Sequence, residues 1–480
     1  MQTKRRAIVW FRQDLRLHDN VALIEAINSA IEVIPVYVFD ERWFGGETNY
    51  GFPKVGPHRT KFIIETIKDL RANLKRINGE LIVRVGKTED ILFELAKKAK
   101  SSWIFCNRER TADEVAVQDA LEQKMWSIGQ EIRFSRGKML YHTADLPFPI
   151  QHVPDTFAQF RKETERYVPV REPLPVPERN LAQLTVDIDP GEIPSMADFG
   201  YEDYEEDARS VLHFKGGETE GLKRLHYYLW ETDLVQTYRE TQNEMLGGDY
   251  STKLSAWLAQ GCLSPKRVYH ELKCYEAERG ENKSTQAIFY DLLWRDFFRF
   301  MAKKHGDVIF EKGGIQGRAP IDGSNDFRLL QRWIDGETGI PFIDAHMKEI
   351  ARTGYMSNRG RQNVASFLIN DLQVNWQMGA EYFESMLIDY DVTSNWGNWN
   401  YLAGVGSEVR EDRALNIMAQ ARRYDPQGEY VKHWLPELRS LPADKVHNPA
   451  ALPDQERKAY NLNGHYANAI IDPRQLMQSS

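Results

Sequence analysis

Cysteine is scarce in this chain of 480 residues. Its three cysteines, Cys106, Cys262 and Cys274, include no C-x-x-C pair, which argues against a disulfide framework and against a zinc or iron–sulfur site. The histidines are scattered without H-x-x-x-H or H-E-x-x-H spacing, so we expect no metal site. No apolar run is long enough for a membrane span, and AIVWF near the basic start is too short for a signal peptide. These absences favour a soluble protein of a reducing compartment, the cytoplasm.

Motifs of nucleotide-binding and hydrolytic enzymes are missing as well. No G-x-G-x-x-G follows the first expected strand, and there is no G-x-S-x-G elbow. VGKT at residues 85–88 looks like the end of a P-loop, but Leu81 stands where the upstream glycine is required. The net charge of −8 does not predict a general polyanion binder, although it allows a local basic face.

Residues 1–140 alternate two periodicities. RAIVWF, VIPVYVFD, ELIVRV, SWIFCN and EIRFSRG have the character of short buried strands, and the segments between them have helical periodicity. This alternation predicts an α/β domain with a parallel sheet covered by helices on both faces. Ligands of such sheets usually lie at the carboxyl ends of the strands.

Residues 141–217 differ from both neighbouring regions. Nine of the 21 prolines lie between Pro147 and Pro194, and an acidic run follows at 201–207. We expect a connector on the surface without much regular structure. Residues 218–480 show almost only helical periodicity and predict an all-α domain. The fold class is therefore α/β plus all-α, in two domains, as the length of the chain also favours.

Two segments of the helical half combine polar and aromatic residues in unusual ways. In GGDYSTKLS, residues 247–255, hydroxyls and backbone N–H groups at a helix start would suit a diphosphate, although an ordinary helix cap explains the segment better when it is taken alone. In DLLWRDFFRF, Asp291 and Arg295 are four residues apart with Trp294 between them, and a surface ion pair is an equally good explanation.

Two further segments complete the set. Arg359 and Arg361 flank a glycine beside Asn358, and guanidinium groups can hold a carboxylate or phosphate, although a solvated basic turn is the simpler explanation. The stretch DYDVTSNWGNWNY, residues 389–401, is too rich in amides and aromatics to be explained by packing alone. A large planar cofactor with a diphosphate needs all of these groups: hydroxyls, arginine, asparagine and aromatic walls.

Several of these segments resemble the photolyase/cryptochrome family. They are WFRQDLRLHDN at 10–20, STKLS at 251–255, LLWRDFF at 292–298, the run from WIDGETGIPFIDAHM to GYMSNR, and DYDVTSNWGNWNY. The resemblance covers nearly the whole chain with the motifs in order. QHVPDTFAQFRK at 151–162, Gln362 and the ending NWGNWNY resemble the cryptochrome DASH branch in particular. The family implies a Rossmann-like antenna domain at 1–140, a connector at 141–217 and a helical FAD-binding domain at 218–480.

The resemblance also implies which residues hold the flavin. The diphosphate and ribityl chain would be held by one loop, consisting of Ser251, Thr252, Lys253, Leu254 and Ser255. Tyr238 would line the same site. Asp389 would pair with Arg361 beside the isoalloxazine ring. Asp391 would lie along that ring, and Asn395 would face its N5 atom.

A light-driven electron path and an antenna pigment are implied too. Members of the family reduce the flavin through three tryptophans, which would be Trp399 nearest the flavin, then Trp376, then Trp333 toward the surface. From the sequence alone, Trp333 and Trp376 would be assigned to the core. The antenna pigment would be methenyltetrahydrofolate, and Glu109, at the end of a strand, would contact it. A surface carboxylate is an equally good explanation for Glu109.

The implied activity is blue-light-driven repair of cyclobutane pyrimidine dimers by electron transfer from reduced FAD. Photolyases take their target bases out of the stack. Asp291 and Asn358 would contact the dimer or an adenine, and Trp294 would stack on the bases. The DNA backbone phosphates would meet three arginines, namely Arg295, Arg359 and Arg413.

This chain departs from the family at two substrate positions. Asp291 replaces a glutamate, and Tyr401 replaces a second stacking tryptophan. A smaller platform stacks less strongly, where stacking contributes about 1–3 kcal/mol per base. Because a single strand is already unpaired, we expect single-stranded DNA to be the preferred substrate. We also expect non-specific DNA or RNA as candidate partners, no membrane association and a monomer.

Two other functions remain open at this stage. A blue-light photoreceptor that signals without repair would share the flavin site and the tryptophans. A nucleic-acid-binding regulator with a structural flavin would bind without light-driven turnover.

Overall fold

The computed structural model describes residues 5–178, 180–210, 212–318, 323–408, 414–462, 464–466 and 469–471. Its single parallel sheet has the strand order β3-β2-β1-β4-β5. The strands are β1 (Arg6–Phe11), β2 (Glu32–Asp40), β3 (Ile82–Gly86), β4 (Trp103–Asn107) and β5 (Glu131–Ser135). The prediction of a parallel α/β domain is confirmed, and the order reverses between β1 and β4.

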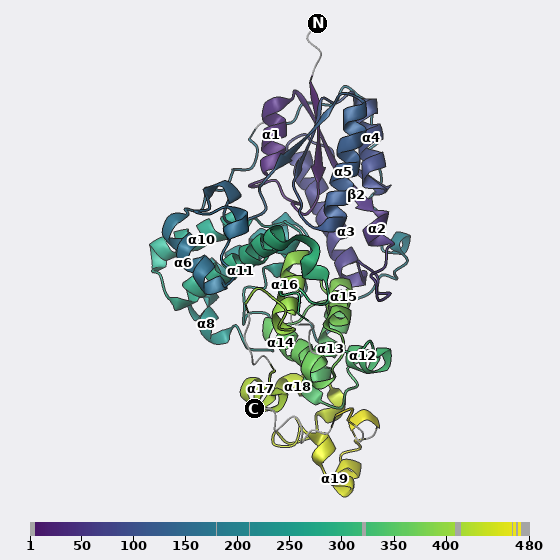
Figure 1. Cartoon of the computed structure of the whole chain (residues 1–480), viewed down its shortest axis with the longest axis vertical. Coiled ribbons are helices and arrows are strands. Elements are labelled where there is room, and N and C mark those ends of the chain that lie inside the picture. Colours follow the sequence, from purple (N-terminus) through teal and green to yellow (C-terminus); the bar gives the residue numbers. More distant parts are fainter. Residues whose placement is uncertain are drawn as a thin grey trace.

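Helices cover both faces of the sheet because successive side chains of each strand point to opposite sides. Ala7, Val9 and Phe11 of β1 belong to the apolar cluster under α1 (Val21–Ser29) and α3 (Pro57–Arg76). The residues between them, Ile8 and Trp10, belong to the cluster under α4 (Thr88–Ala99) and α5 (Ala112–Ser127). A short helix, α2 (Glu41–Phe44), follows β2. The carboxyl ends of the strands point toward the helical half of the molecule (Figure 1).

The connector holds more regular structure than its proline content suggests. Helix α6 (Phe157–Tyr167) begins after Thr156, whose hydroxyl accepts from the backbone N–H of Gln159 at 3.4 Å. Phe157 and Phe160 are buried and pack against aromatic side chains of α11 (Lys283–His305). The amphipathic pattern of α6 therefore docks this segment on the helical domain.

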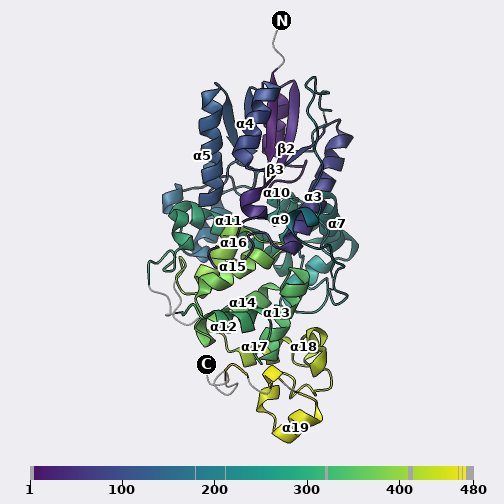
Figure 2. The same cartoon turned by 90° about the vertical axis from the view of Figure 1, so that its right-hand side faces the viewer.

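The remaining helices form the second half of the molecule, which lies beyond the sheet along the long axis (Figure 2). They are α7 (Glu218–His226), α8 (Tyr238–Thr241), α9 (Ser255–Ala259), α10 (Pro265–Arg279), α11, α12 (Phe327–Ile334), α13 (Pro341–Thr353), α14 (Asn358–Ser366), α15 (Trp376–Met386), α16 (Val392–Leu402), α17 (Ile417–Tyr424), α18 (Glu429–Trp434) and α19 (Asp454–Ala459). Helix α11, the longest of these, packs against α16 and begins with a capping box between Asn282 and Thr285.

Buried polar contacts join the two domains. Glu218, the first residue of α7, accepts from the backbone N–H groups of Leu17 and His18 at 2.8 and 3.0 Å. The guanidinium of Arg16 donates to the carbonyl of Gly261 at 2.8 Å, and Lys266 pairs with Asp19 at 2.7 Å. The charged residues of the segment at 10–20 therefore fix the α/β domain to the helical domain.

Candidate cofactor and substrate site

The loop before α9 is held by a buried arginine on α7. The guanidinium of Arg224 donates to the carbonyls of Gly248, Ser251 and Thr252 at 2.8, 3.1 and 3.0 Å. Helix α9 begins at Ser255, and the residue before it, Leu254, provides no side-chain cap. An ordinary helix cap therefore does not account for the hydroxyls of this loop. Arg224 was not among the residues singled out from the sequence, where it looks like one charged residue on an amphipathic helix.

Lys253 occupies an unusual position in this loop. It is buried and has a left-handed backbone conformation, with φ of 53°. Its ammonium lies over the rings of Tyr250 and Tyr355, 3.6 and 4.8 Å from their centroids, and it forms no ion pair with any described residue. Burial lowers its pKa to about 7. A buried cation without an anion fits the diphosphate of a cofactor held by this loop.

The expected pair of Asp389 and Arg361 is present in the structure. The guanidinium donates to both carboxylate oxygens, at 3.0 and 2.8 Å. It also donates to the carbonyl of Met356 at 2.9 Å and lies over the ring of Tyr355, which connects this pair to Lys253. The loop before α9 and the carboxylate before α16 are therefore neighbours, as a cofactor that spans both requires.

Asp391 caps α16 and makes a buried ion pair. Its carboxylate accepts from the backbone N–H of Ser394 at 3.0 Å and pairs with Arg299 of α11. Burial would raise the pKa of this carboxyl, but the nearby guanidinium groups of Arg299 and Arg295 hold the pKa well below its usual range. Arg299 was not identified from the sequence, although it follows Arg295 by one helical turn in WRDFFRF.

Asn395 is buried on α16 and keeps a free acceptor. Its side-chain amide donates to the carbonyl of Ala380 at 3.0 Å, and no described residue donates to its side-chain oxygen. That oxygen can therefore accept a hydrogen bond from a bound group.

Asp291 and Tyr238 form a hydrogen-bonded pair between α11 and α8. Asp291 is accessible to water, yet protein surrounds its carboxyl group closely enough to raise the pKa to about 6. Asn358, the first residue of α14, is exposed and makes no side-chain hydrogen bond to a described residue. Both polar groups are thus available to a ligand.

The contacts of Arg295 match neither of its two expected roles, a surface ion pair with Asp291 or a contact to a DNA backbone phosphate. It forms no ion pair with Asp291, and its guanidinium donates to the carbonyls of Lys138 and Leu258 at 2.9 and 3.2 Å. The surface ion pair that the spacing suggested is therefore wrong. These contacts lie between the α/β domain and the helical domain, so the structure does not turn this side chain toward a DNA backbone.

Of the other two arginines expected to contact phosphate, the structure describes only Arg359. Arg359 is half-buried. Its guanidinium donates to the side-chain oxygen of Asn243 at 3.1 Å and to that of Gln362 at 2.8 Å. Arg413 lies outside the residues that the structure describes.

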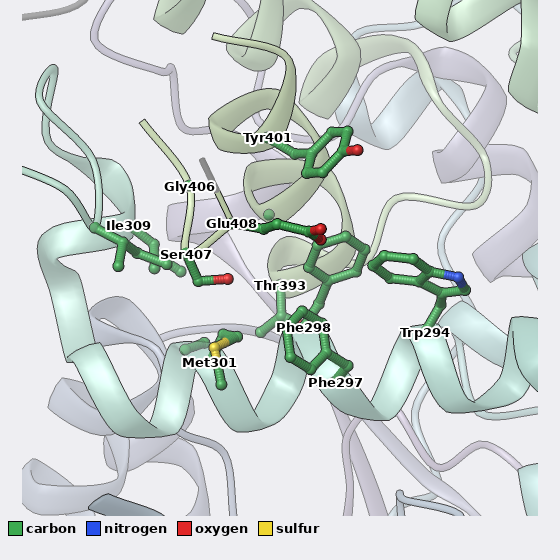
Figure 3. Close-up of a pocket in the computed structure, with 13 residues that line it drawn as sticks. Trp294, Phe297, Phe298, Met301, Ile309, Thr393, Tyr401, Gly406, Ser407 and Glu408 are labelled. Atoms are coloured by element: carbon green, nitrogen blue, oxygen red, sulfur yellow. The ribbon is translucent and has the colours of Figure 1, made fainter. Parts of the chain in front are cut away.

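A small apolar pocket lies between α11 and α16. Figure 3 shows Trp294 and Phe298 of α11 and Tyr401 of α16 around it, with Glu408 nearby. Trp294 stacks on Phe157 of α6, with ring centroids 3.7 Å apart and an interplanar angle of 11°. One face of Trp294 is thus already covered by an aromatic ring. Phe157 was not identified as part of the site from the sequence.

The three tryptophans expected to carry electrons are all buried. Trp376 contacts Trp396, with ring centroids 5.7 Å apart. Trp399 approaches the backbone so closely at Gly379 that an added Cβ there would overlap its ring. Gly379 follows Trp376 by about one helical turn on α15, so Trp399 packs on the turn of α15 that begins with Trp376.

Trp333 does not lie toward the surface, so that expectation is wrong. It is fully buried, donates from its indole N–H to the carbonyl of Val364 at 3.1 Å, and packs against Phe383. The apolar stripe of α12 faces the core, while Phe327 at its start is exposed. The periodicity predicts the stripe but does not say which side of the helix meets solvent.

A cavity of about 370 Å³ lies between the sheet and the helical domain. Aromatic residues from both sides line it, namely Trp10, Tyr37, Trp43, Phe44, Phe310, Tyr390 and Trp396. Its position at the carboxyl ends of β1 and β2, beside the reversal of strand order, is usual for ligands of such sheets. Glu109, which is expected to contact an antenna pigment, does not line this cavity. Its carboxylate is buried against Lys138, whereas Glu114, in the first turn of α5, lines the cavity.

In the part of the chain that the structure describes, no group of three or more His, Cys, Asp or Glu residues is arranged to hold a metal ion. Likewise, none of the described helices is long and apolar enough to cross a membrane.

A five-stranded parallel α/β domain joined to a helical domain with these carboxylate–arginine pairs defines the photolyase class of proteins. The family model described as "DNA photolyase" matches residues 7–178, and that described as "FAD binding domain of DNA photolyase" matches residues 288–479. The structure matches the crystal structure of a cryptochrome from Synechocystis with a TM-score of 0.95, at 42% identity, over 100% of this chain and 99% of the other. A bacterial class III photolyase from Agrobacterium tumefaciens matches with a TM-score of 0.85, at 26% identity, over 99% and 96% of the two chains.

Curated relatives place the chain more narrowly. It is 46% identical to "Cryptochrome DASH" of Gloeobacter violaceus, over 98% of this chain and 94% of the relative. It is 44% identical to "Cryptochrome DASH" of Synechocystis, over 95% and 92%. The chain belongs to the photolyase/cryptochrome family, in its cryptochrome DASH branch, and it contains the family's FAD-binding domain.

Proposed function

We propose that this protein binds FAD and uses blue light to repair cyclobutane pyrimidine dimers in single-stranded DNA. The observations that carry the proposal are two accessible polar groups, Asp291 of α11 and Asn358 of α14, and an aromatic pocket lined by Trp294 and Tyr401. The carboxylate and amide suit the hydrogen-bonding edges of bases, and the aromatic side chains suit their faces. We expect this to take place in the cytoplasm.

The residues that would hold FAD follow from the contacts within the helical domain. Lys253 and the loop organised by Arg224 would hold the diphosphate, because the buried ammonium forms no ion pair with a described residue. Arg361 with Asp389, and Arg299 with Asp391, would orient the ring system between fixed charges. Asn395 would offer its free side-chain oxygen to a ring N–H. When bound and reduced, FAD supplies the electron that splits the dimer under blue light.

Asp291 would hold the substrate through a hydrogen bond whose direction depends on its protonation. Its pKa is raised to about 6, so the carboxylate is mostly charged at pH 7 and accepts a hydrogen bond from the hydroxyl of Tyr238. One oxygen then remains for an N–H of a pyrimidine or adenine. Because aspartate is shorter than glutamate, the base has to come closer to α11 for this contact to form.

Preference for single strands rests on the aromatic residues of the pocket. Trp294 has one face on Phe157, and the other family stacking position in the pocket is occupied by Tyr401 rather than a larger indole. Stacking on aromatic side chains contributes about 1–3 kcal/mol per base. This platform therefore offsets less of the cost of extracting a dimer from a duplex, a few kcal/mol, which a single strand mostly avoids.

Trp399 and Trp376 would pass electrons toward the flavin. Trp399 packs against Gly379, one helical turn after Trp376, and both indoles are buried. Trp333 has no place in this path. The cavity between the domains would hold a planar antenna pigment such as methenyltetrahydrofolate, for which its aromatic walls are suited.

The test is light-dependent recovery of thymine from a dimer in a single-stranded oligonucleotide, using purified protein with reduced flavin. Asp291→Ala should lower the affinity for the dimer-containing strand by about tenfold or more, because one charge-assisted hydrogen bond contributes about 1.5–3 kcal/mol. Asp307→Ala, in the turn after the same helix, serves as the control. Binding of damaged and undamaged strands with equal affinity, and no thymine recovered, would instead favour a signalling or regulatory flavoprotein.

A further inference from the structure

We propose that Arg108, Arg110, Arg136 and Lys303 form a binding site for a small oligoanion of the diphosphate or triphosphate class. The first two residues follow β4, the third follows β5, and the last is near the end of α11. The three arginines thus lie at the carboxyl ends of two neighbouring parallel strands, and Lys303 lies within electrostatic reach of all three. This edge of an open α/β sheet is where phosphate-bearing ligands usually bind.

The loops that carry the arginines are fixed by the backbone. The N–H of Arg108 donates to the carbonyl of Ser135 at 3.0 Å, and its guanidinium lies over the ring of Phe134 at 5.0 Å. The N–H of Glu109 is held by Gln118 at 2.8 Å. The two loops are therefore tied to one another and to α5 before any ligand binds, which limits the ordering cost of binding.

The four cations have no counter-charge among the described residues. None of them forms an ion pair or a side-chain hydrogen bond there. The nearest carboxylate, Glu109, is buried and already paired with Lys138. Arg108, Arg110 and Arg136 are exposed, and Lys303 is half-buried. Positive charges held close together without a counter-charge repel one another, and a bound anion would offset this repulsion.

The pKa shifts agree with this arrangement. Burial and the three arginines together lower the pKa of Lys303 to about 8. Burial, Arg108 and Arg136 also lower the pKa of Arg110. An anion among these groups would raise both pKa values again.

The site is distinct from the proposed DNA pocket. Lys303 follows Trp294 by nine residues on α11, which is about two and a half turns, so the two side chains project from opposite sides of the helix. It is also distinct from the cavity between the domains, because none of the four cations lines that cavity, although the residues that follow Arg110, from Thr111 to Glu114, do. Planar guanidinium groups bind phosphate oxygens in pairs, and three of them favour an anion with more than one phosphate group.

Isothermal titration of tripolyphosphate and of pyrophosphate into FAD-loaded protein tests the proposal, because bound FAD fills the loop at Lys253. We expect one saturable site in the wild-type protein. Arg110→Ala with Arg136→Ala should weaken tripolyphosphate binding by about tenfold or more. The control is Arg76→Ala with Lys98→Ala, which removes the same charge near the ends of α3 and α4, at the opposite edge of the sheet. The control should leave binding unchanged.

Three outcomes would overturn the proposal. Absence of saturable binding in the wild-type protein would show that the cluster holds no small oligoanion. An equal loss in the control would show a general effect of net charge. If the cluster variant loses affinity only for an undamaged single-stranded oligonucleotide, and tripolyphosphate does not bind, the cluster is a nucleic-acid contact instead. Because Arg110 and Arg136 are exposed, circular dichroism of both variants should match the wild type.

Discussion

Asp391 shows how a buried carboxylate in the flavin site stays charged. It is paired with Arg299 and caps α16, so its pKa is well below that of a free aspartate, near 4. Because the folded-state pKa is lowered, this group stabilises the fold at pH values above the unfolded pKa. That contribution is lost as the pH falls below about 4.

Asp391→Asn should therefore destabilise the protein at pH 7, by about 3–5 kcal/mol, since it leaves Arg299 buried without a counter-charge. The difference from wild type should stay constant between pH 7 and about 4 and then narrow as the wild-type carboxylate takes up protons. Urea unfolding followed by circular dichroism across this range measures both quantities. A difference that is already shrinking at pH 6 would contradict the assigned pKa direction.

Trp376 and Trp333 provide a second contrast between single residues. Both are buried, but Trp376 lies on the turn of α15 that Trp399 packs against, whereas Trp333 is on α12. Trp376→Phe should slow light-driven flavin reduction by a soluble thiol at least tenfold, whereas Trp333→Phe should leave that rate unchanged. The measurement is bleaching of the flavin absorbance under blue light. Trp333→Phe should instead lower the unfolding free energy by about 1–3 kcal/mol, because it leaves a void in the core. Equal slowing of flavin reduction in both variants would show that Trp333 also carries electrons.

Helix α6 links the connector to the substrate pocket through the stack of Phe157 on Trp294. Phe157→Leu keeps most of the buried apolar volume but removes the aromatic pair, which is worth about 0.5–1.5 kcal/mol. We expect affinity for a dimer-containing single strand to fall by about twofold to tenfold, measured by fluorescence anisotropy. Phe160→Leu on the same helix should leave that affinity unchanged, because Phe160 packs on Phe297 and Phe300 instead. Equal losses in both variants would point to general loosening of α6.

The sequence predicts secondary structure where a segment keeps one hydrophobic periodicity. It does not predict where one helix ends and the next begins within a continuous apolar stripe. The five strands and their helices follow from apolar runs and amphipathic stripes. Residues 361–376, RQNVASFLINDLQVNW, carry one apolar stripe of helical periodicity, but α14 ends at Ser366, a π-helical turn follows, and α15 begins at Trp376 after the cap residue Asn375. The pairing of Asp389 with Arg361 was inferred by resemblance. Arg224, Arg299 and Phe157 were missed because each looks like part of an ordinary amphipathic helix.

The arrangement of the two domains creates the cavity that neither domain has alone. Ala112→Trp, at the start of α5, should fill part of this cavity and abolish sensitisation by methenyltetrahydrofolate, while repair driven by direct flavin absorption stays unchanged. Ala116→Trp is the matched control, since Ala116 is exposed on the same helix and does not line the cavity. The measurement is repair rate against excitation wavelength with and without the pigment. Unchanged sensitisation in Ala112→Trp would place the antenna elsewhere.

The central claim concerns the substrate of the whole molecule, and one comparison tests it most directly. Reduced, FAD-loaded protein is given the same thymine dimer in a single strand and in the matching duplex, and thymine recovery is followed under blue light. We predict repair that is largely confined to the single strand, because Trp294 and Tyr401 stack too weakly to offset extraction from a duplex. Equal repair of both substrates would contradict the substrate preference, and no repair of either would contradict the proposed activity.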